Sequence, residues 1–195
     1  MQSYRLFVAI SLPEEVKARI EQAQAELRRV LANDPVRWTR REQFHLTLKF
    51  MGDTPVNRIE RLTLAVRSVC AAFPVLRLRA KGIGAFPDLK SPRVIWTGVE
   101  DREGFLLKLQ PAVDAAVREF TNEKAEGEFT GHVTLGRARG LKRSQAETFA
   151  AMAAEMAERE FGGWAADKVE IIRSELSPGG ARYTTLAVAP LQPRV

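Results

Sequence analysis

Hydrophobic and polar residues follow a strand-like spacing in some stretches of the chain and a helix-like spacing in others. The stretches that read as strands span residues 4–11, 45–51, 75–81, 93–99, 129–135, 168–176 and 182–189. The stretches that read as helices span about 12–31, 55–73, 104–120 and 144–161. Strands and helices are mixed in both halves of the chain, which predicts an α+β fold with antiparallel pairing.

Local signals predict where the helices begin and end. Ser11 precedes a proline at the first helix start, so its side chain is expected to cap that helix. Asn33-Asp34-Pro35 would end it, and Gly52-Asp53-Thr54-Pro55 reads as the turn before the second helix. Ser144-Gln145-Ala146-Glu147 matches a capping box. Residues 82–92 read as a turn-rich loop, and the last two strands flank a turn at 177–180.

Composition and charge narrow the class of protein. Hydrophobic residues make up 45% of the chain and charged residues 28%, as in ordinary globular proteins, and no apolar run is long enough to span a membrane. The net charge of +6 favours polyanionic partners. The first residues lack the pattern of a signal peptide, and a single cysteine, Cys70, cannot form an internal disulfide. We therefore expect a cytoplasmic protein.

Both histidines of the chain open the same four-residue pattern. The two copies are His45-Leu46-Thr47-Leu48 and His132-Val133-Thr134-Leu135, and they lie nearly half a chain length apart. For typical composition, chance produces both copies about once in 40,000. In a strand, residues i and i+2 share a face, so each copy presents an imidazole beside a hydroxyl and directs its apolar residues to a core. Two such strands, from duplicated lobes, are expected to face each other across a cleft.

A pair of imidazoles suits in-line attack on phosphorus. A neutral histidine removes a proton from water while a protonated one supplies a proton to the leaving oxygen, and threonine hydroxyls donate to the phosphoryl oxygens. The alternatives are weaker. Two histidines without a further His or Cys cluster make a poor zinc site, and no Gly-x-Ser-x-Gly turn indicates a serine nucleophile. A single His-x-Thr would more often be simple packing, but the duplication argues against that interpretation.

Other residues near the motifs have less specific interpretations. Lys49 shares strand parity with His45 and Thr47, so it either adds positive charge at the cleft edge or faces solvent. Several aromatic residues are candidates for stacking on a terminal base or for the core: Trp38, Phe44, Phe86, Phe129 and Tyr183.

The motifs sit within segments that together resemble one known family. The segments are Tyr4–Pro13, Trp38 with Phe44–Gly52, Gly84–Pro87, Arg93–Trp96, Phe129–Arg137, and Ser174–Leu176 with Gly180, Tyr183 and Leu186. They cover essentially the whole chain. They resemble the 2H phosphoesterase superfamily and, within it, the bacterial and archaeal RNA 2′,3′-cyclic phosphodiesterases, historically called 2′-5′ RNA ligases. One departure is Gly131, where the family usually has proline, and we expect it to affect the backbone before the strand more than the chemistry.

The resemblance implies a bilobal, duplicated fold. Residues 1–195 would form a single domain of two pseudo-symmetric lobes, each contributing one His-x-Thr strand. Two antiparallel sheets would flank a central basic cleft, with the helices on the outside.

The resemblance also implies a reaction and a set of roles. The reaction is hydrolysis of a 2′,3′-cyclic phosphate to a 2′-phosphomonoester, with reversible 2′-5′ RNA ligation as the related transfer. His45 would be the proton donor toward the departing 3′-oxygen and His132 the proton acceptor from water. Thr47 and Thr134 would hold the phosphoryl oxygens, and Arg137 would bind phosphate. Strict alternation turns Arg137 away from the cleft, so this role requires a bulge or strand end at Gly136; otherwise Arg137 is a surface residue.

The expected partner is RNA with a 2′,3′-cyclic phosphate end, or a small cyclic nucleotide. No metal or other cofactor is expected, no membrane, and the chain is expected to be a monomer. Two alternatives stay open: a non-catalytic module that binds RNA ends, and a phosphodiesterase for 2′-5′ oligonucleotides or small nucleoside cyclic phosphates.

Overall fold

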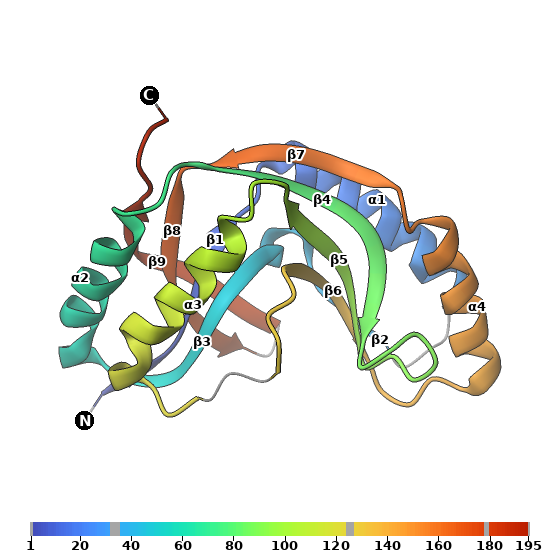
Figure 1. The fold of residues 1–195 in the computed structure, drawn as a ribbon. Helices are drawn as coiled ribbons and strands as arrows, with labels where there is room; N and C mark the ends of the chain where they lie inside the picture. The colour runs from blue at the N-terminus through green and yellow to red at the C-terminus, as the bar shows by residue number, and fades with distance from the viewer. Residues whose placement is uncertain (1, 32–35, 124–126, 178–179, 195) are drawn as a thin grey trace.

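A computed structural model describes residues 2–31, 36–123, 127–177 and 180–194 of the chain (Figure 1). Over these residues the helices are α1 (Glu14–Val30), α2 (Ile59–Cys70), α3 (Leu106–Val117) and α4 (Arg143–Glu155), with short 3-10 helices η1 (Arg41–Gln43), η2 (Val56–Arg58) and η3 (Arg118–Phe120). The strands are β1 (Ser3–Ser11), β2 (Val36–Trp38), β3 (His45–Pro55), β4 (Leu76–Phe86), β5 (Val94–Asp101), β6 (His132–Ala138), β7 (Glu160–Ala166), β8 (Lys168–Ser177) and β9 (Gly180–Pro190).

The strands form one curled antiparallel sheet in the order β7-β4-β5-β6-β3-β1-β8-β9, with β2 paired to β6. The predicted α+β fold is therefore confirmed. Where two sheets were expected, the structure has one continuous sheet, whose two halves are joined between β3 and β6 by a single residue pair, Leu46 with Val133. Figure 1 shows α1 and α4 outside the half that contains β4 and β7, and α2 and α3 outside the other half.

Two glycine-containing segments that read as turns are continuous strand. β3 runs through residues 52–55 because Gly52, at φ 64°, follows a bulge in the β1–β3 pairing. In the same way β4 runs to Phe86 through much of the expected 82–92 loop, with Gly82 at φ 70° beside a register shift. Glycine marks a bulge as readily as a turn, since it adopts the positive φ that some bulges and some turns require.

Helix starts also differ from expectation. α1 begins after Pro13 with no side-chain cap, and the Ser11 hydroxyl instead donates to Glu170 on β8. α4 is capped ahead of the predicted box, where the backbone N–H of Lys142 donates to Gln145 at 2.7 Å. It ends at Glu155, and the rest of the expected helix leads into β7, which pairs with β4. The predicted stop at residues 33–35 and the middle of the 177–180 turn lie outside the described residues.

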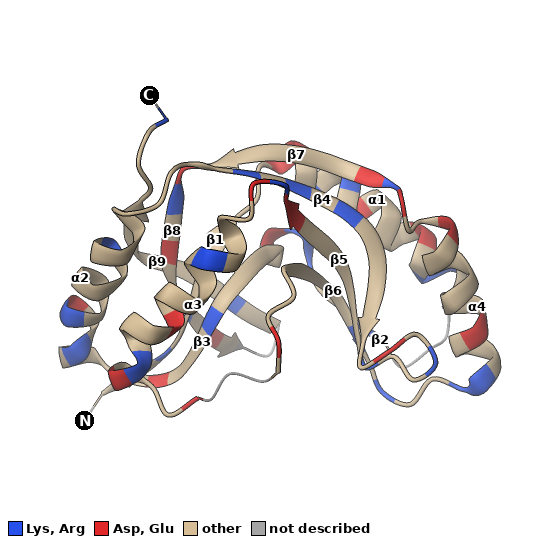
Figure 2. Ribbon diagram, viewed as in Figure 1, with Lys and Arg blue, Asp and Glu red and all other residues tan. Residues whose placement is uncertain are grey.

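The main core lies between the helices and the convex face of the sheet. On β1, Leu6, Val8 and Ile10 belong to this core. The alternate residues Phe7 and Ala9 are also buried, in a small separate cluster on the concave face. Strand β1 is therefore apolar on both faces, as its continuous hydrophobic run predicted. Acidic and basic residues mix on the outer helices α2 and α4 (Figure 2), and no helix among the described residues is long and apolar enough to cross a membrane.

Candidate active site

The two His-x-Thr motifs meet strand to strand at the middle of the sheet. Leu46 and Val133, the second residue of each motif, form the one residue pair between β3 and β6, and both are fully buried. Because the strands are antiparallel, this register sets His45 beside Thr134 and Thr47 beside His132. All four polar residues are half-buried on the concave face. The motifs therefore adjoin along one ladder, rather than facing each other across a gap.

Each imidazole is oriented by a backbone carbonyl two residues earlier. His45 Nδ1 lies 2.6 Å from the Gln43 carbonyl oxygen, and His132 Nδ1 lies 2.8 Å from that of Thr130. A carbonyl oxygen only accepts hydrogen bonds, so Nδ1 carries the proton in both rings. Nε2 is then the nitrogen left for chemistry, as a base when neutral and as an acid when protonated.

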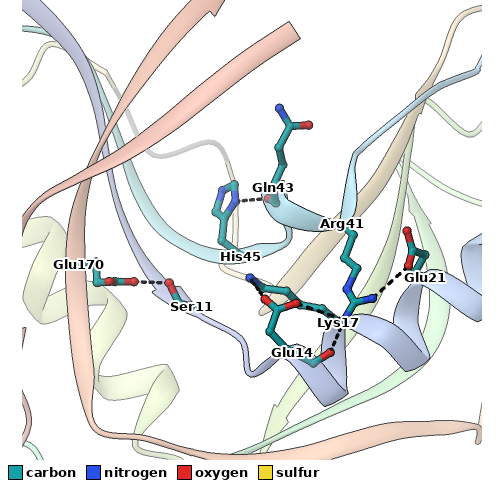
Figure 3. Close-up of polar contacts among 8 residues, drawn as sticks. All are labelled: Ser11, Glu14, Lys17, Glu21, Arg41, Gln43, His45 and Glu170. Carbon is teal, nitrogen blue, oxygen red and sulfur yellow. Dashed lines mark hydrogen bonds and ion pairs between the residues drawn. The ribbon is translucent and has the colours of Figure 1, made fainter. Parts of the chain in front are cut away.

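Gln43 is held in place by contacts between η1 and the start of α1. Arg41 in η1 donates to the backbone and carboxylate oxygens of Glu14 at 3.0 and 3.1 Å, and Glu14 also pairs with Lys17 at 2.9 Å. Figure 3 shows this network next to His45. It anchors the segment that orients the first imidazole.

Aromatic rings pack against both histidines. Phe7 and Tyr183 lie 4.6 and 5.3 Å from the His45 ring, centroid to centroid. Phe86 and Trp96 lie 5.0 and 6.2 Å from the His132 ring. Of the five aromatic residues considered from sequence, Phe86 and Tyr183 thus flank the site. Phe44 is buried in the main core, and Trp38 and Phe129 pack against that core.

This packing lowers the pKa of both histidines. Burial brings the pKa of His45 to about 4; the hydrogen bond to the Gln43 carbonyl opposes the shift. The positive charges of His132 and Lys17 lower the pKa of His45 further. The pKa of His132 is also lowered, first by burial and then by the charge of Arg137, again against its carbonyl hydrogen bond. Both imidazoles are therefore neutral at pH 7 in the free protein.

A bulge in β6 turns Arg137 onto the concave face. In the β5–β6 pairing Trp96 opposes Thr134 and Ile95 opposes Gly136, which leaves Leu135 as the extra residue. Arg137 therefore shares the face of Thr134 and is exposed there. The bulge that its expected role required is present. Gly136 itself is needed for packing, since a Cβ there would lie 2.9 Å from the Trp38 ring.

A matching bulge in β3 makes the expectation for Lys49 wrong. Leu48 is the extra residue between the pairs Ala9–Thr47 and Val8–Lys49, so Lys49 leaves the face of the motif. Its side chain is buried, with Nζ 2.6 Å from Asp114 Oδ1 on α3 and 2.9 Å from the carbonyl oxygen of Glu123. Lys49 ties β3 to α3 and adds no charge at the cleft.

Phe50 takes the place on the concave face that Lys49 leaves. Its side chain is 54% exposed, and its ring lies 6.3 Å from Phe7. Phe50 is the fifth residue after His45, as Arg137 is the fifth after His132. The sequence shows this correspondence, but strict strand alternation places both residues on the face opposite to their histidines.

A buried carboxylate lies beside the first motif and was not found from sequence. Glu170 is 8% exposed and accepts a hydrogen bond from Ser11, the residue paired with His45 across β1 and β3 (Figure 3). The Thr185 hydroxyl lies 3.5 Å from the same carboxylate. A glutamate on an alternating strand gives no sign of burial, because burial depends on which strands cover it. Among the described residues no group of three His, Cys, Asp or Glu could hold a metal.

Known proteins are similar to this chain in sequence. The family model described as LigT-like phosphoesterase matches residues 10–96. The chain is 35% identical over 190 residues to an RNA 2′,3′-cyclic phosphodiesterase of Thermus thermophilus, across 93% of this chain and 87% of that protein. It is 31% identical over 186 residues to one of Methanothermobacter thermautotrophicus, across 94% and 97%. The chain belongs to the LigT-like phosphoesterase family. The resemblance that the motifs indicated is thereby confirmed.

Solved structures share the fold of this LigT-like phosphoesterase. The crystal structure of TT0787 of Thermus thermophilus has a TM-score of 0.77 at 29% identity and covers 98% of this chain and 100% of that one. Escherichia coli LigT complexed with 3′-AMP has a TM-score of 0.76 at 23% identity, across 97% and 99%. At that identity the second comparison bears on the fold alone. The curled α+β architecture is therefore a property of the family.

Proposed function

We propose that this LigT-like phosphoesterase hydrolyses RNA ends that carry a 2′,3′-cyclic phosphate to 2′-phosphomonoesters. The observation that carries the proposal is the meeting of two His-x-Thr motifs at the Leu46–Val133 pair, each with Nδ1 held by a carbonyl. The curated relatives named RNA 2′,3′-cyclic phosphodiesterases support the same reaction. A 5′-hydroxyl in place of water would attack the same phosphorus, with the 3′-oxygen again departing, and form a 2′-5′ linkage.

The four motif residues divide the work at the phosphorus. His132 Nε2 takes a proton from the attacking water, and His45 Nε2–H gives one to the departing 3′-oxygen. The Thr47 and Thr134 hydroxyls donate to the non-bridging oxygens, where negative charge builds up. Since each threonine adjoins the histidine of the other motif, a phosphate seated over the β3–β6 ladder meets all four groups.

The substrate itself supplies the charge that His45 needs to act as an acid. The pKa of His45 is about 4 in the free protein because the ring is buried, so it carries no proton at neutral pH. A bound phosphate anion stabilises the imidazolium and raises that pKa. Arg137, on the same face, binds phosphate oxygens, and the exposed Phe50 ring offers a surface on which a base can stack.

Turnover of defined cyclic phosphates tests the proposal. Purified protein in excess EDTA should open a 2′,3′-cyclic nucleotide to the 2′-monophosphate, with a bell-shaped pH–rate profile that reports macroscopic pKa values. His45→Ala and His132→Ala should each lower kcat by about 10²–10⁴-fold with unchanged circular dichroism. A near-normal rate in either variant would contradict the two-histidine mechanism. Salt-dependent RNA binding without turnover would indicate a non-catalytic RNA-end-binding module.

A second experiment distinguishes the acid from the base. A cyclic phosphate with bridging sulfur at the 3′ position has a better leaving group and needs less help from a general acid. His45→Ala should therefore recover much of its lost rate on this substrate, and His132→Ala should not. The opposite pattern would reverse the two roles. A panel with 2′-5′-linked oligonucleotides and small nucleoside cyclic phosphates identifies the preferred substrate.

We also propose that residues 1–195 act as a single domain of two pseudo-symmetric lobes, in a cytoplasmic monomer. The join at Leu46–Val133 and the matching bulges at Leu48 and Leu135 support the two lobes. The free, buried Cys70 fits a reducing compartment. Light scattering after size exclusion tests the monomer.

A further inference from the structure

Strand β2 places a second arginine directly opposite Arg137. In the β2–β6 pairing Arg37 opposes Arg137, and Trp38 opposes Gly136. Directly opposed residues of an antiparallel pair project to the same face. Arg37 therefore lies on the concave face with Arg137 and Thr134, while Trp38 packs against the core on the other face. The hydrophobic pattern of the sequence predicts no strand at β2.

Two arginines at directly opposed positions repel each other, so the fold gains nothing from this arrangement without an anion. Both are exposed, and among the described residues no carboxylate lies within ion-pair distance of either. Other arginines of this chain, such as Arg79 and Arg159, do have carboxylate partners. The concave face thus carries two adjacent guanidinium groups, whose planar sets of N–H donors suit phosphate oxygens.

The two arginines lie beside the proposed site of reaction, farther along β6 and β2. The bulge at Leu135 leaves Arg137 two ladder positions beyond Thr134, about 7 Å along the strand. The field of the pair still reaches the site. Burial raises the pKa of Tyr183, and the charges of Arg137, Arg5 and Arg37 oppose that rise. The Tyr183 ring in turn lies 5.3 Å from the His45 ring.

We propose that Arg37 binds the phosphodiester that precedes the terminal nucleotide of an RNA chain, beside Arg137, which binds the terminal phosphate. This inference rests on the proposed function, in which the terminal cyclic phosphate occupies the β3–β6 ladder. Arg37 then makes an RNA chain a better substrate than a cyclic mononucleotide, because only the chain carries a phosphate at this position.

Three matched substrates isolate this contact. They are 2′,3′-cyclic AMP, the dinucleotide ApA ending in a 2′,3′-cyclic phosphate, and the same dinucleotide with an uncharged methylphosphonate in place of its internal phosphodiester. Arg37→Ala should lower kcat/KM about tenfold on the charged dinucleotide, as expected for a lost charge-assisted contact, and change it less than twofold on the other two. Arg37→Lys should retain part of the activity. The slope of log kcat/KM against log salt should become shallower by about one.

Arg143→Ala is the matched control, since Arg143 lies on α4 with its side chain 94% exposed. It removes the same charge and should leave all three rates unchanged. An equal loss on all substrates in Arg37→Ala, or no loss on the charged dinucleotide, would overturn the proposal. If the wild-type protein turns over none of the substrates, the proposed function has failed, and binding of labelled ApA 2′-phosphate tests Arg37 by itself. Binding weakened about tenfold would uphold its role, and unchanged binding would refute it.

Discussion

The buried imidazole of His45 makes the stability of this protein depend on pH in a window that the structure predicts. The pKa of His45 is about 4 in the folded chain, against 6.5 for an unperturbed histidine. The unfolded chain therefore takes up the proton first as the pH falls, and folding loses free energy below about pH 6.5. The loss is complete once the pH has fallen through about 4.

The size of the effect follows from the two pKa values. Full loss amounts to roughly 3 kcal/mol, and at pH 5 about 2 kcal/mol is already lost. The stabilisation is present at neutral pH and disappears on acidification, because burial disfavours the charged ring. His45→Asn removes the titrating group and keeps a polar side chain at the same place.

Urea denaturation at pH 7 and pH 5 measures the difference. Between the two pH values the wild-type free energy of unfolding should fall by about 2 kcal/mol more than that of His45→Asn, at equal m-values. Inorganic phosphate should reduce the difference if the anion binds over the β3–β6 ladder and stabilises the protonated ring. An identical acid sensitivity in wild type and variant would refute the argument that His45 is buried and neutral.

Three further substitutions test other features of the site. Lys49→Met leaves the Asp114 carboxylate without its partner and should cost roughly 2–3 kcal/mol in chemical denaturation, with most of it recovered by adding Asp114→Leu; a neutral single variant would contradict the buried pair. Gly136→Ala forces a Cβ within 2.9 Å of the Trp38 ring and should lower stability by roughly 1–3 kcal/mol; an unchanged Tm would disprove this packing. Phe50→Ala should raise KM for a cyclic nucleotide about tenfold, as expected for a lost stacking surface, with little effect on Tm because the side chain is 54% exposed. A large loss of stability without a change in KM would instead assign Phe50 to the core.

The sequence by itself determined the features that depend on short-range periodicity. A strand places residues i and i+2 on one face whatever surrounds it, so the pairing of His45 with Thr47 and of His132 with Thr134 could be stated without the fold. The order of most strands and helices, and the duplication of the motif, came from the same local patterns. The segments that resemble the family then supplied the reaction and the roles of these residues.

Only the tertiary structure decided what lies beyond the first three residues of each motif. A bulge is a relation between two strands, and nothing within one strand specifies the register of its neighbour. The bulges at Leu48 and Leu135 send Lys49 into a buried ion pair and bring Phe50 and Arg137 onto the concave face.

The same reason applies to the residues that sequence analysis missed. The Glu170 carboxylate contacts Ser11 on β1 and Thr185 on β9, the two strands that flank its own. Arg37 has a role to test only because a three-residue strand pairs with β6 and sets it opposite Arg137. Strand partners far apart in the chain decided the surroundings of the two histidines, while local periodicity was enough to find them.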